Sequence, residues 1–202
     1  MQQNFAKLRH KAEQGDANAR NELGVALGAG RGIARDDLAA VNHFRSGGEA
    51  GSMAALANLG LLLAQNRGVQ GEAVEARRVL GVAAKAGLAV AQNNLGVLLW
   101  SGAGGPRSDA EAVAWFRRAA DAGVATAAFN LGISYVAGRG TEADGARGLK
   151  WLRQAADRGY PEAMIFLGTL FVAGAENDNA LHYALEWFRR ALALAPRRAR
   201  TM

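Results

Sequence analysis

AAFNLGISYVAGRGTEADGARGLKWLRQAADRG, residues 127–159, holds a pattern that recurs along the chain. Its Leu131-Gly132 pair is one of five Leu-Gly pairs, and each pair follows the previous one by 36 residues. The other four begin at Leu23, Leu59, Leu95 and Leu167. A fixed period of this length indicates a repeat array, in which each unit buries its apolar face against the next. The expected class of function is therefore a binding scaffold.

Several other positions keep the same interval. An alanine stands four residues before each leucine, and a glycine stands eight residues before it, as Ala127 and Gly123 do before Leu131. A second column holds Phe or Leu between successive pairs: Phe44, Leu80, Phe116, Leu152 and Phe188. Trp precedes this column in three units, at Trp115, Trp151 and Trp187. So many columns in phase predict one continuous array.

Each unit is predicted to form two helices. In residues 89–100, apolar residues at i, i+4, i+7 and i+8 share one helical face. A glycine cluster such as Gly138-Arg139-Gly140 then ends the first helix, because glycine enters the left-handed region at little cost. The second helix is expected to begin near an Asp or Ser that accepts from the free N–H groups of its first turn. These residues are Asp36, Ser108 and Asp144.

These motifs resemble the Sel-one-like repeat, a relative of the tetratricopeptide repeat. The resemblance rests on the run Ala-x-x-x-Leu-Gly, Gly-x-Gly, then Ala-x-x-Trp-(Phe/Leu)-x-x-Ala-Ala-x-x-Gly. It covers roughly residues 2–195. Together with the periodicity it implies an all-α fold, an α/α solenoid that winds as a right-handed superhelix. Some copies depart from the pattern: Asn66 and Glu176 replace loop glycines, Ala180 replaces a capping residue, and Gly47-Gly48 replaces an Ala-Ala pair. Each helical glycine costs about 1 kcal/mol relative to alanine, so reduced helix stability is expected near Gly47-Gly48.

The expected organisation is eleven helices. Residues 1–15 form an N-terminal capping helix, in which Phe5, Leu8 and Ala12 keep the phase of the second-helix columns. Five helix pairs follow at about 16–51, 52–87, 88–123, 124–159 and 160–195. The last helix is expected from about Asn179 to Leu194, and residues 196–202 are a basic tail with Arg197, Arg198 and Arg200.

Composition excludes several classes of protein. The chain has no cysteine, so no disulfide framework is expected. No window approaches 18 uninterrupted apolar residues, and no apolar stretch follows the basic N-terminus, so neither a membrane span nor a secretory signal is predicted. The cytoplasm is the expected compartment, with the periplasm as the alternative if a signal has been removed.

The formal charge of +6 raises the question of nucleic acid. The arginines are dispersed, however, and the pairs Arg77-Arg78, Arg117-Arg118 and Arg189-Arg190 follow the repeat on second helices. They predict a solvated outer stripe that attracts acidic partners. Helical repeats that recognise one base per unit need matched polar residues in every copy, and this sequence has no such ladder.

Catalytic and metal sites are not predicted. The glycine loops lack the preceding strand and the lysine of a phosphate-binding loop. His10, His43 and His182 are far apart in the array, and His182 with Glu186 is expected to be a surface pair. None of the serines tested for Ser-x-x-Lys has the lysine: Ser46, Ser52, Ser101, Ser108 and Ser134. The protein is expected to be no enzyme and to hold no cofactor or metal.

A ladder of asparagines precedes three of the Leu-Gly pairs, at Asn58, Asn94 and Asn130. Such amides either capture the backbone of a bound peptide or bond a neighbouring helix and satisfy polar groups between units. The second interpretation is favoured, and the first stays open.

The predicted binding surface lies on the first helices, which line the concave side in tetratricopeptide relatives. The positions two before and two after each Leu, with a neighbour one turn further, define it. It is mostly apolar, with Trp100 and Phe129 as its largest anchors, so it favours an amphipathic or extended apolar segment. The predicted binding residues are Leu61, Asn93, Val97, Trp100, Phe129, Ile133, Val136, Ile165 and Val172.

The functional hypothesis is a non-catalytic protein–protein adaptor of bacterial type that binds a partner segment in this concave groove. The partner is expected to be a protein or peptide segment, acidic or amphipathic. One alternative is an immunity or regulatory protein that neutralises a specific toxin or enzyme, as some members of the resembling family do. A nucleic-acid-binding helical repeat is the alternative from another class.

Overall fold

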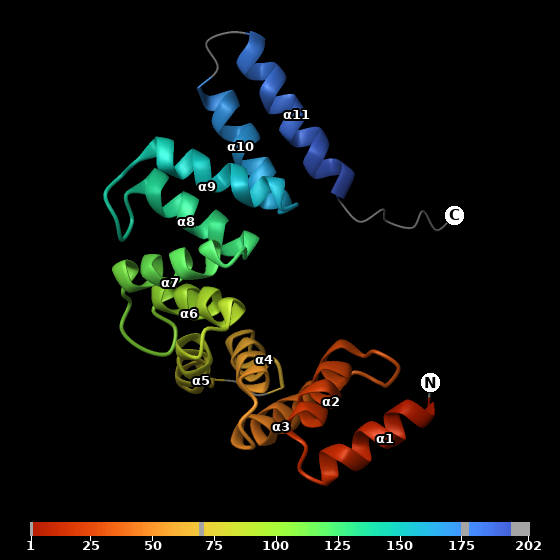
Figure 1. Ribbon diagram of the computed structural model, residues 1–202. Coiled ribbons are helices and arrows are strands. Elements are labelled where there is room, and N and C mark those ends of the chain that lie inside the picture. The colour runs from red at the N-terminus through yellow and green to blue at the C-terminus, as the bar shows by residue number, and fades with distance from the viewer. Residues whose placement is uncertain (1, 69–70, 175–177, 195–202) are drawn as a thin grey trace. The chain divides into compact units, whose positions relative to one another are not determined.

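The computed structural model describes residues 2–68, 71–174 and 178–194, and all regular structure in these ranges is α-helical (Figure 1). The chain divides into two compact units, residues 1–115 (unit 1) and 116–202 (unit 2), with the boundary inside α7. Each unit is described by itself. The helices are α1 (Gln2–Glu13), α2 (Ala17–Ala29), α3 (Asp37–Glu49), α4 (Met53–Ala64), α5 (Ala73–Lys85), α6 (Ala89–Ser101), α7 (Asp109–Asp121), α8 (Ala125–Ala137), α9 (Gly145–Asp157), α10 (Pro161–Ala173) and α11 (Asp178–Leu194).

Capping residues begin several helices where the sequence predicts them. Asp36 accepts from the Ala39 N–H at 2.9 Å, and Asp144 accepts from the Arg147 N–H at 2.9 Å. Asp16 and Ser52 cap first helices in the same way, which the sequence pattern did not single out. Each side chain satisfies an N–H group that has no partner within the helix.

The ends of the first helices follow the glycine pattern. Gly30, Gly102 and Gly138 adopt left-handed conformations one residue past α2, α6 and α8. Asn66 stands at the matching position after α4 and reaches φ 53°, the only positive φ of a non-glycine residue in the described part of the chain. Asparagine tolerates this conformation better than most residues, so the replacement leaves the turn intact.

The Leu-Gly pairs form the contact between the two helices of a unit. The leucine is buried, as Leu59 and Leu131 show, and the glycine leaves room for a large side chain of the following helix. In unit 2, a Cβ added to Gly132 would lie 2.7 Å from Leu152 Cγ, and one added to Gly168 would lie 2.6 Å from Phe188 Cε1. The recurring Leu-Gly pair and the recurring Phe or Leu of the next helix therefore pack against each other.

Successive helix pairs within unit 1 are joined through their first helices and their loops. The helix α4 contacts both α2 and α6. Arg67, in the loop after α4, donates to the Gly28 carbonyl at 2.6 Å and to Asp37 at 2.6 Å, so it ties the end of α2 to the start of α3. At the front, the Phe5 ring of α1 lies against loop residue Gly32, and Ala12 is buried.

The Gly47-Gly48 pair lies in a continuous helix, because α3 runs through both residues. A Cβ added to Gly47 would stand 3.0 Å from the Ala55 Cβ, and one added to Gly48 would meet Leu56. The helices α3 and α4 thus approach closely at the two glycines. This packing offsets part of the helix stability that glycine loses relative to alanine.

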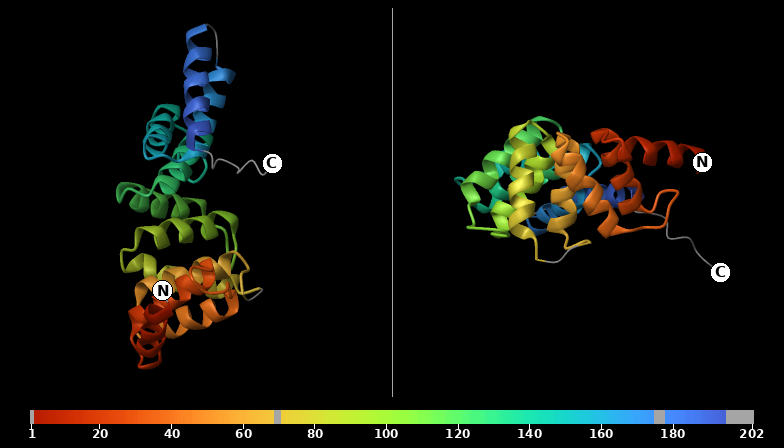
Figure 2. Two further views of the ribbon diagram at one scale, coloured as in Figure 1. Left: turned by 90° about the vertical axis from the view of Figure 1, so that its right-hand side faces the viewer. Right: turned by 90° about the horizontal axis from the view of Figure 1, so that it is seen from below.

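The C-terminal predictions are tested only in part. The last helix, α11, begins at Asp178, one residue before the expected start, and ends at Leu194 as expected. In unit 2, α8 packs on α9 and α10 packs on α11 (Figures 1 and 2). Glu176 and the tail residues Arg197, Arg198 and Arg200 lie outside the described residues.

Candidate partner-binding surface

The predicted apolar positions of unit 2 lie on α8 and α10. Phe129, Ile133 and Val136 follow one another at i, i+4 and i+7 along α8, and all three are half-buried. On α10, Ile165 and Val172 are seven residues apart and are 50% and 49% exposed. These two aliphatic side chains are the most accessible members of the predicted surface.

Phe129 is the centre of an aromatic cluster that the sequence analysis missed. Its ring centroid lies 5.2 Å from that of Tyr160 and 6.0 Å from that of Phe166, both in edge-to-face geometry. Burial, with a smaller contribution from the Glu162 charge, raises the pKa of the Tyr160 hydroxyl above its ordinary value. Such ring pairs stabilise the packing of α8 against the start of α10, so only part of Phe129 is accessible to a partner.

Val136 is partly used by packing between α8 and α9. A Cβ added to Gly148 would lie 2.5 Å from Val136 Cγ2 and 3.0 Å from the Gly132 carbonyl oxygen. Gly148 replaces the alanine found at this column in the other units, and the two helix backbones approach closely there. Val136 therefore contributes to the core of unit 2 as well as to its surface.

The predicted positions of unit 1 lie on α4 and α6, which contact each other. Val97 is 44% exposed, whereas Leu61 and Trp100 are half-buried. Asn93 is buried, and its Nδ2 donates to Asn94 Oδ1 at 3.3 Å. The accessible part of this stretch is therefore aliphatic and aromatic.

The asparagine ladder makes contacts within the fold. Asn58 Nδ2 donates to Asn21 Oδ1 at 2.8 Å, which joins α4 to α2. Asn94 accepts from Asn93 on its own helix. At Asn58 the favoured interpretation, a bond to a neighbouring helix, is confirmed.

The second helices carry the arginine pairs, and several of these side chains are engaged. Arg77 donates to the Pro106 carbonyl at 2.8 Å, whereas Arg78 is exposed and lies 4.0 Å from Glu75. Arg117 Nη2 donates to the buried Tyr135 hydroxyl. The stripe therefore contains both solvated arginines and arginines that join neighbouring units.

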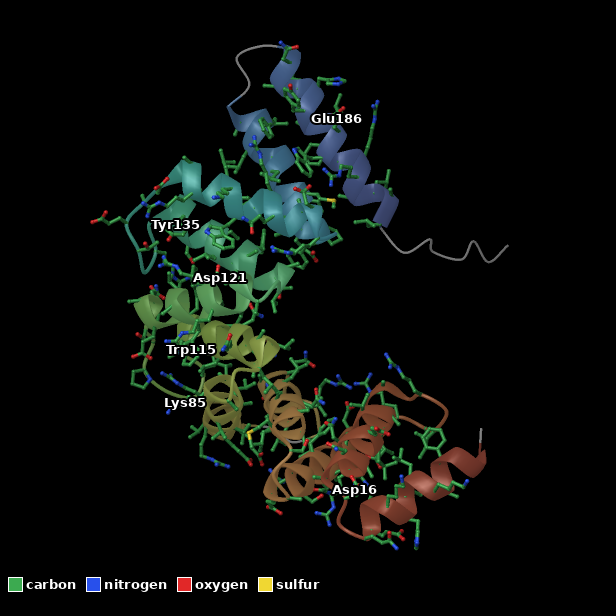
Figure 3. The ribbon with its side chains drawn as sticks, in the orientation of Figure 1. Asp16, Lys85, Trp115, Asp121, Tyr135 and Glu186 are labelled. Atoms are coloured by element: carbon green, nitrogen blue, oxygen red, sulfur yellow. The ribbon has the colours of Figure 1, made fainter. Side chains whose placement is uncertain are left out.

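Tyr135, labelled on α8 in Figure 3, is flanked by two arginines. The guanidinium carbons of Arg117 and Arg147 each lie 5.9 Å from its ring centroid, a distance at which a cation is attracted by the ring. Arg147 also pairs with Asp144 at 3.0 Å. The sequence does not predict this cluster, because its three residues come from three different helices.

A hollow of about 460 Å³ lies between α9, α10 and α11. Phe171 and Tyr183 form one wall, with ring centroids 5.9 Å apart, and Arg190 stacks over the Trp187 ring at 4.3 Å. Figure 3 labels Glu186, which lines the hollow from α11. The complete lining is Arg153, Phe171, Tyr183, Glu186, Trp187 and Arg190. The one sequence feature that marked this location was the recurring tryptophan, which here is Trp187.

The remaining sequence prediction for a surface pair concerns His182 and Glu186 of α11. His182 Nε2 lies 3.5 Å from Glu186 Oε1, and both side chains are exposed, so they form the expected surface pair. Within the same residues, no group of three or more His, Cys, Asp or Glu side chains is placed to hold a metal ion. None of the described helices is both long and apolar enough to cross a membrane.

Comparison with solved structures places this architecture among known proteins. A Sel1 repeat protein from Oxalobacter formigenes is 28% identical with a TM-score of 0.79, over 90% of this chain and 72% of that chain. The protective antigen c5321, present in uropathogenic Escherichia coli strains and displaying an SLR fold, is 31% identical with a TM-score of 0.81. The match covers 94% of this chain, which spans only 40% of the length of c5321.

A more distant likeness shows the fold alone. The immunity protein Pa5087 from Pseudomonas aeruginosa is 18% identical with a TM-score of 0.59, over 94% of this chain and 71% of that chain. No curated protein sequence matches the chain.

The family model named Sel1 repeat matches residues 17–52, 89–124, 125–160 and 161–195, more than half of the chain. These ranges leave out the unit at 53–88, although α4 and α5 form a helix pair there and Gly60 makes room for Leu80 as in the other units. That unit has Asn66 for a loop glycine and Val79 in place of the tryptophan. The chain belongs to the Sel1 repeat family, whose helical repeats are scaffolds suited to binding other proteins.

Proposed function

We propose that this protein is a non-catalytic adaptor that holds a segment of a partner protein on the surfaces of its first helices. The observation that supports this most directly is the exposure of aliphatic side chains at repeated first-helix positions, Val97 in unit 1 and Ile165 and Val172 in unit 2. Aliphatic side chains exposed to water on the first helices are unfavourable in solution, and burying them under a partner is favourable.

The residues expected to contribute most to binding differ from those inferred from the sequence alone. Trp100 and Phe129 are half-buried, and Phe129 belongs to an aromatic cluster, so their removal also disturbs the fold. Val97, Ile165 and Val172 are the better anchors to test. A helix that presents aliphatic side chains at i, i+3 or i+4 and i+7 fits such a surface.

The test is affinity capture from the native cell followed by mass spectrometry. We expect Val97→Arg and Ile165→Arg each to reduce capture of the partner at least tenfold. Val82→Arg is the matched control, because Val82 is 42% exposed on the second helix α5. All three variants should keep the helicity and melting temperature of the wild type, since the replaced side chains are exposed. Unchanged capture by both first-helix variants contradicts the proposal.

The same capture separates the two alternatives. An immunity or regulatory protein would bring down one toxin or enzyme, whose activity falls at a 1:1 ratio. A nucleic-acid-binding repeat would bring down nucleic acid, with an affinity that falls steeply as salt is raised. Pa5087, which is named an immunity protein, shares the fold at 18% identity, and an immunity role of this chain stays a prediction.

A further inference from the structure

An arginine column on the second helices has a carboxylate partner at Arg45. Arg45 of α3 donates to Glu75 of α5, from Nη2 to Oε2 at 2.8 Å and from Nε to Oε1 at 3.3 Å. Arg45 Nη2 also donates to Glu72 at 3.1 Å. The Arg45 guanidinium lowers the pKa of the Glu75 carboxyl below its ordinary value. The glutamate thirty residues after the arginine thus neutralises it across two repeat units.

Unit 2 keeps the arginines of this column but not the carboxylates. Arg117 and Arg153 occupy the positions 72 and 108 residues after Arg45. The residues thirty positions further on are Arg147 and Tyr183, where the first copy has Glu75. Arg117 finds a different partner, the Tyr135 hydroxyl.

Arg153 lacks that partner as well. The residue that corresponds to Tyr135 one unit later is Phe171, which has no hydroxyl. Arg153 is exposed and makes no hydrogen bond or ion pair with any residue that the structure describes. Its position is the hollow between α9, α10 and α11, beside Phe171 and Tyr183.

Each of the other charged side chains of the hollow lies within 4 Å of a further polar side chain, and the neighbour of Glu186 is a histidine, which carries a charge only when protonated. Arg190 Nη2 lies 3.2 Å from Asp157 Oδ1, and its guanidinium stacks on Trp187. Glu186 lies 3.5 Å from His182. Arg153 is therefore the one lining cation that forms no ion pair with the described residues, and Phe171, Tyr183 and Trp187 line the same hollow.

We propose that this hollow, the Arg153 pocket, binds an Asp or Glu side chain from an acidic segment of a partner protein. The incoming carboxylate takes the place that Glu75 occupies beside Arg45. A carboxylate and a guanidinium form two parallel hydrogen bonds, which are stronger than hydrogen bonds between neutral groups. The aromatic walls also accept an apolar neighbour of that acidic residue, so a segment that alternates acidic and apolar residues fits best.

The pocket favours an acidic peptide over nucleic acid. Glu186 lines it and Asp157 stands beside Arg190, so a continuous chain of phosphates would pass close to two carboxylates. A peptide can place a single carboxylate at Arg153 and keep neutral groups elsewhere. The pocket lies wholly on residues of unit 2 and does not depend on the adaptor surface of the first helices.

The first experiment uses the full chain and the probe peptide acetyl-Leu-Asp-Leu-Asp-Leu-Asp-amide. Binding is followed by the indole N–H signal of Trp187, one of four tryptophans, in ¹H–¹⁵N NMR spectra. We expect Arg153→Ala to weaken binding about tenfold or more, the usual effect of losing a charged hydrogen-bonded partner. Arg158→Ala is the matched control and should stay within twofold, since Arg158 is an exposed arginine at the C-cap of α9 and does not line the pocket.

A second variant tests the pocket without removing the arginine. Tyr183→Glu places a carboxylate thirty residues after Arg153, as Glu75 stands after Arg45, and should raise the melting temperature while it weakens peptide binding about tenfold. Tyr183→Gln, which keeps a similar shape without the charge, should do neither. The proposal is overturned if the peptide with Asn for Asp binds equally well, if Arg153→Ala binds like the wild type, or if oligo-dT binds the pocket more tightly than the peptide. Val97→Arg and Ile165→Arg should leave this binding unchanged, so its failure and that of the adaptor proposal are distinguishable.

Discussion

The Phe44 ring of α3 lies directly over the backbone of Gly24 in α2. A Cβ added to Gly24 would stand 2.6 Å from Phe44 Cε1, and Phe44 is only 2% exposed, so the ring has little room to move. The same relation recurs as Gly168 with Phe188 in unit 2. The glycine of the Leu-Gly pair is thus required by packing between helices, although a helix by itself would favour alanine there.

Gly24→Ala should lower the free energy of unfolding by about 1–3 kcal/mol, because the added methyl group overpacks a closed contact. Gly81→Ala is the control: Gly81 is also helical, but an added Cβ would meet nothing within 4 Å. That variant should gain about 0.5–1 kcal/mol from better helix propensity. Urea unfolding followed by circular dichroism measures both. Equal effects of the two substitutions would contradict the packing role.

The fold was predictable because its signals are local and repeated. The period, the helix pairs, the capping Asp36 and Asp144 and the C-terminal glycines all follow from short-range preferences that the structure bears out. The partner of each glycine was not predictable, since Gly24 and Phe44 are twenty residues apart and the sequence does not give the distance between their helices. The Leu-Gly and Phe/Leu columns were recognised as separate patterns, and only the structure shows that they touch.

The surface was less predictable than the fold. Periodicity placed Ile165 and Val172 on one face of a helix, and both are exposed. It could not show that Phe129 is covered by Tyr160 and Phe166, because the three rings meet from two helices and the turn between units. The Arg153 pocket was missed for a similar reason: the absence of a carboxylate thirty residues after an arginine has meaning only once the Arg45–Glu75 contact is known.

Phe129→Ala should destabilise the protein as well as alter its surface. The ring is half-buried and makes two edge-to-face contacts, so we expect a loss of about 2 kcal/mol. Ile165→Ala, at a 50% exposed position, should cost about 0.5 kcal/mol. Thermal unfolding of the two variants at pH 7 makes the comparison. A Phe129 variant as stable as the Ile165 variant would show that the aromatic cluster contributes little.

Asp37 should make stability depend on pH in the acid range. Hydrogen bonds from Arg35 and then from Arg67 hold the pKa of the Asp37 carboxyl well below its ordinary value of about 3.9. A carboxyl whose pKa is lower in the folded state adds stability above the unfolded pKa and loses it as pH falls toward the folded pKa. Melting temperatures of the wild type and Asp37→Asn should therefore differ at pH 6 and converge as pH falls below about 4. Asp121→Asn is the control, because Asp121 is exposed and forms no ion pair with the described residues, and a constant difference for Asp37→Asn at all pH values would refute the assignment.

Two arginines at the same repeat position should differ in their importance. Arg31 and Arg67 are 36 residues apart, and both lie in the loop after a first helix. Arg67 bonds the Gly28 carbonyl and both oxygens of Asp37, whereas Arg31 is exposed and has no side-chain partner among the described residues. Arg67 therefore joins two successive helix pairs. Arg31 occupies the matching position in the first such loop, where no earlier helix pair is available to be joined.

Arg67→Ala should lower the free energy of unfolding by about 1–2 kcal/mol, because it removes the side-chain donor to the Gly28 carbonyl and one of the two guanidinium groups bonded to Asp37. Arg31→Ala should change it by less than about 0.5 kcal/mol. Arg67→Lys should recover only part of the loss, since an ammonium group cannot bond Asp37 through two parallel N–H groups and reach the carbonyl as well. Amide hydrogen exchange adds a local measurement: Arg67→Ala should speed exchange in the first turn of α3 and the last turn of α2 before it affects α5. Uniformly faster exchange throughout unit 1 would instead place the role of Arg67 in global stability rather than in this one junction.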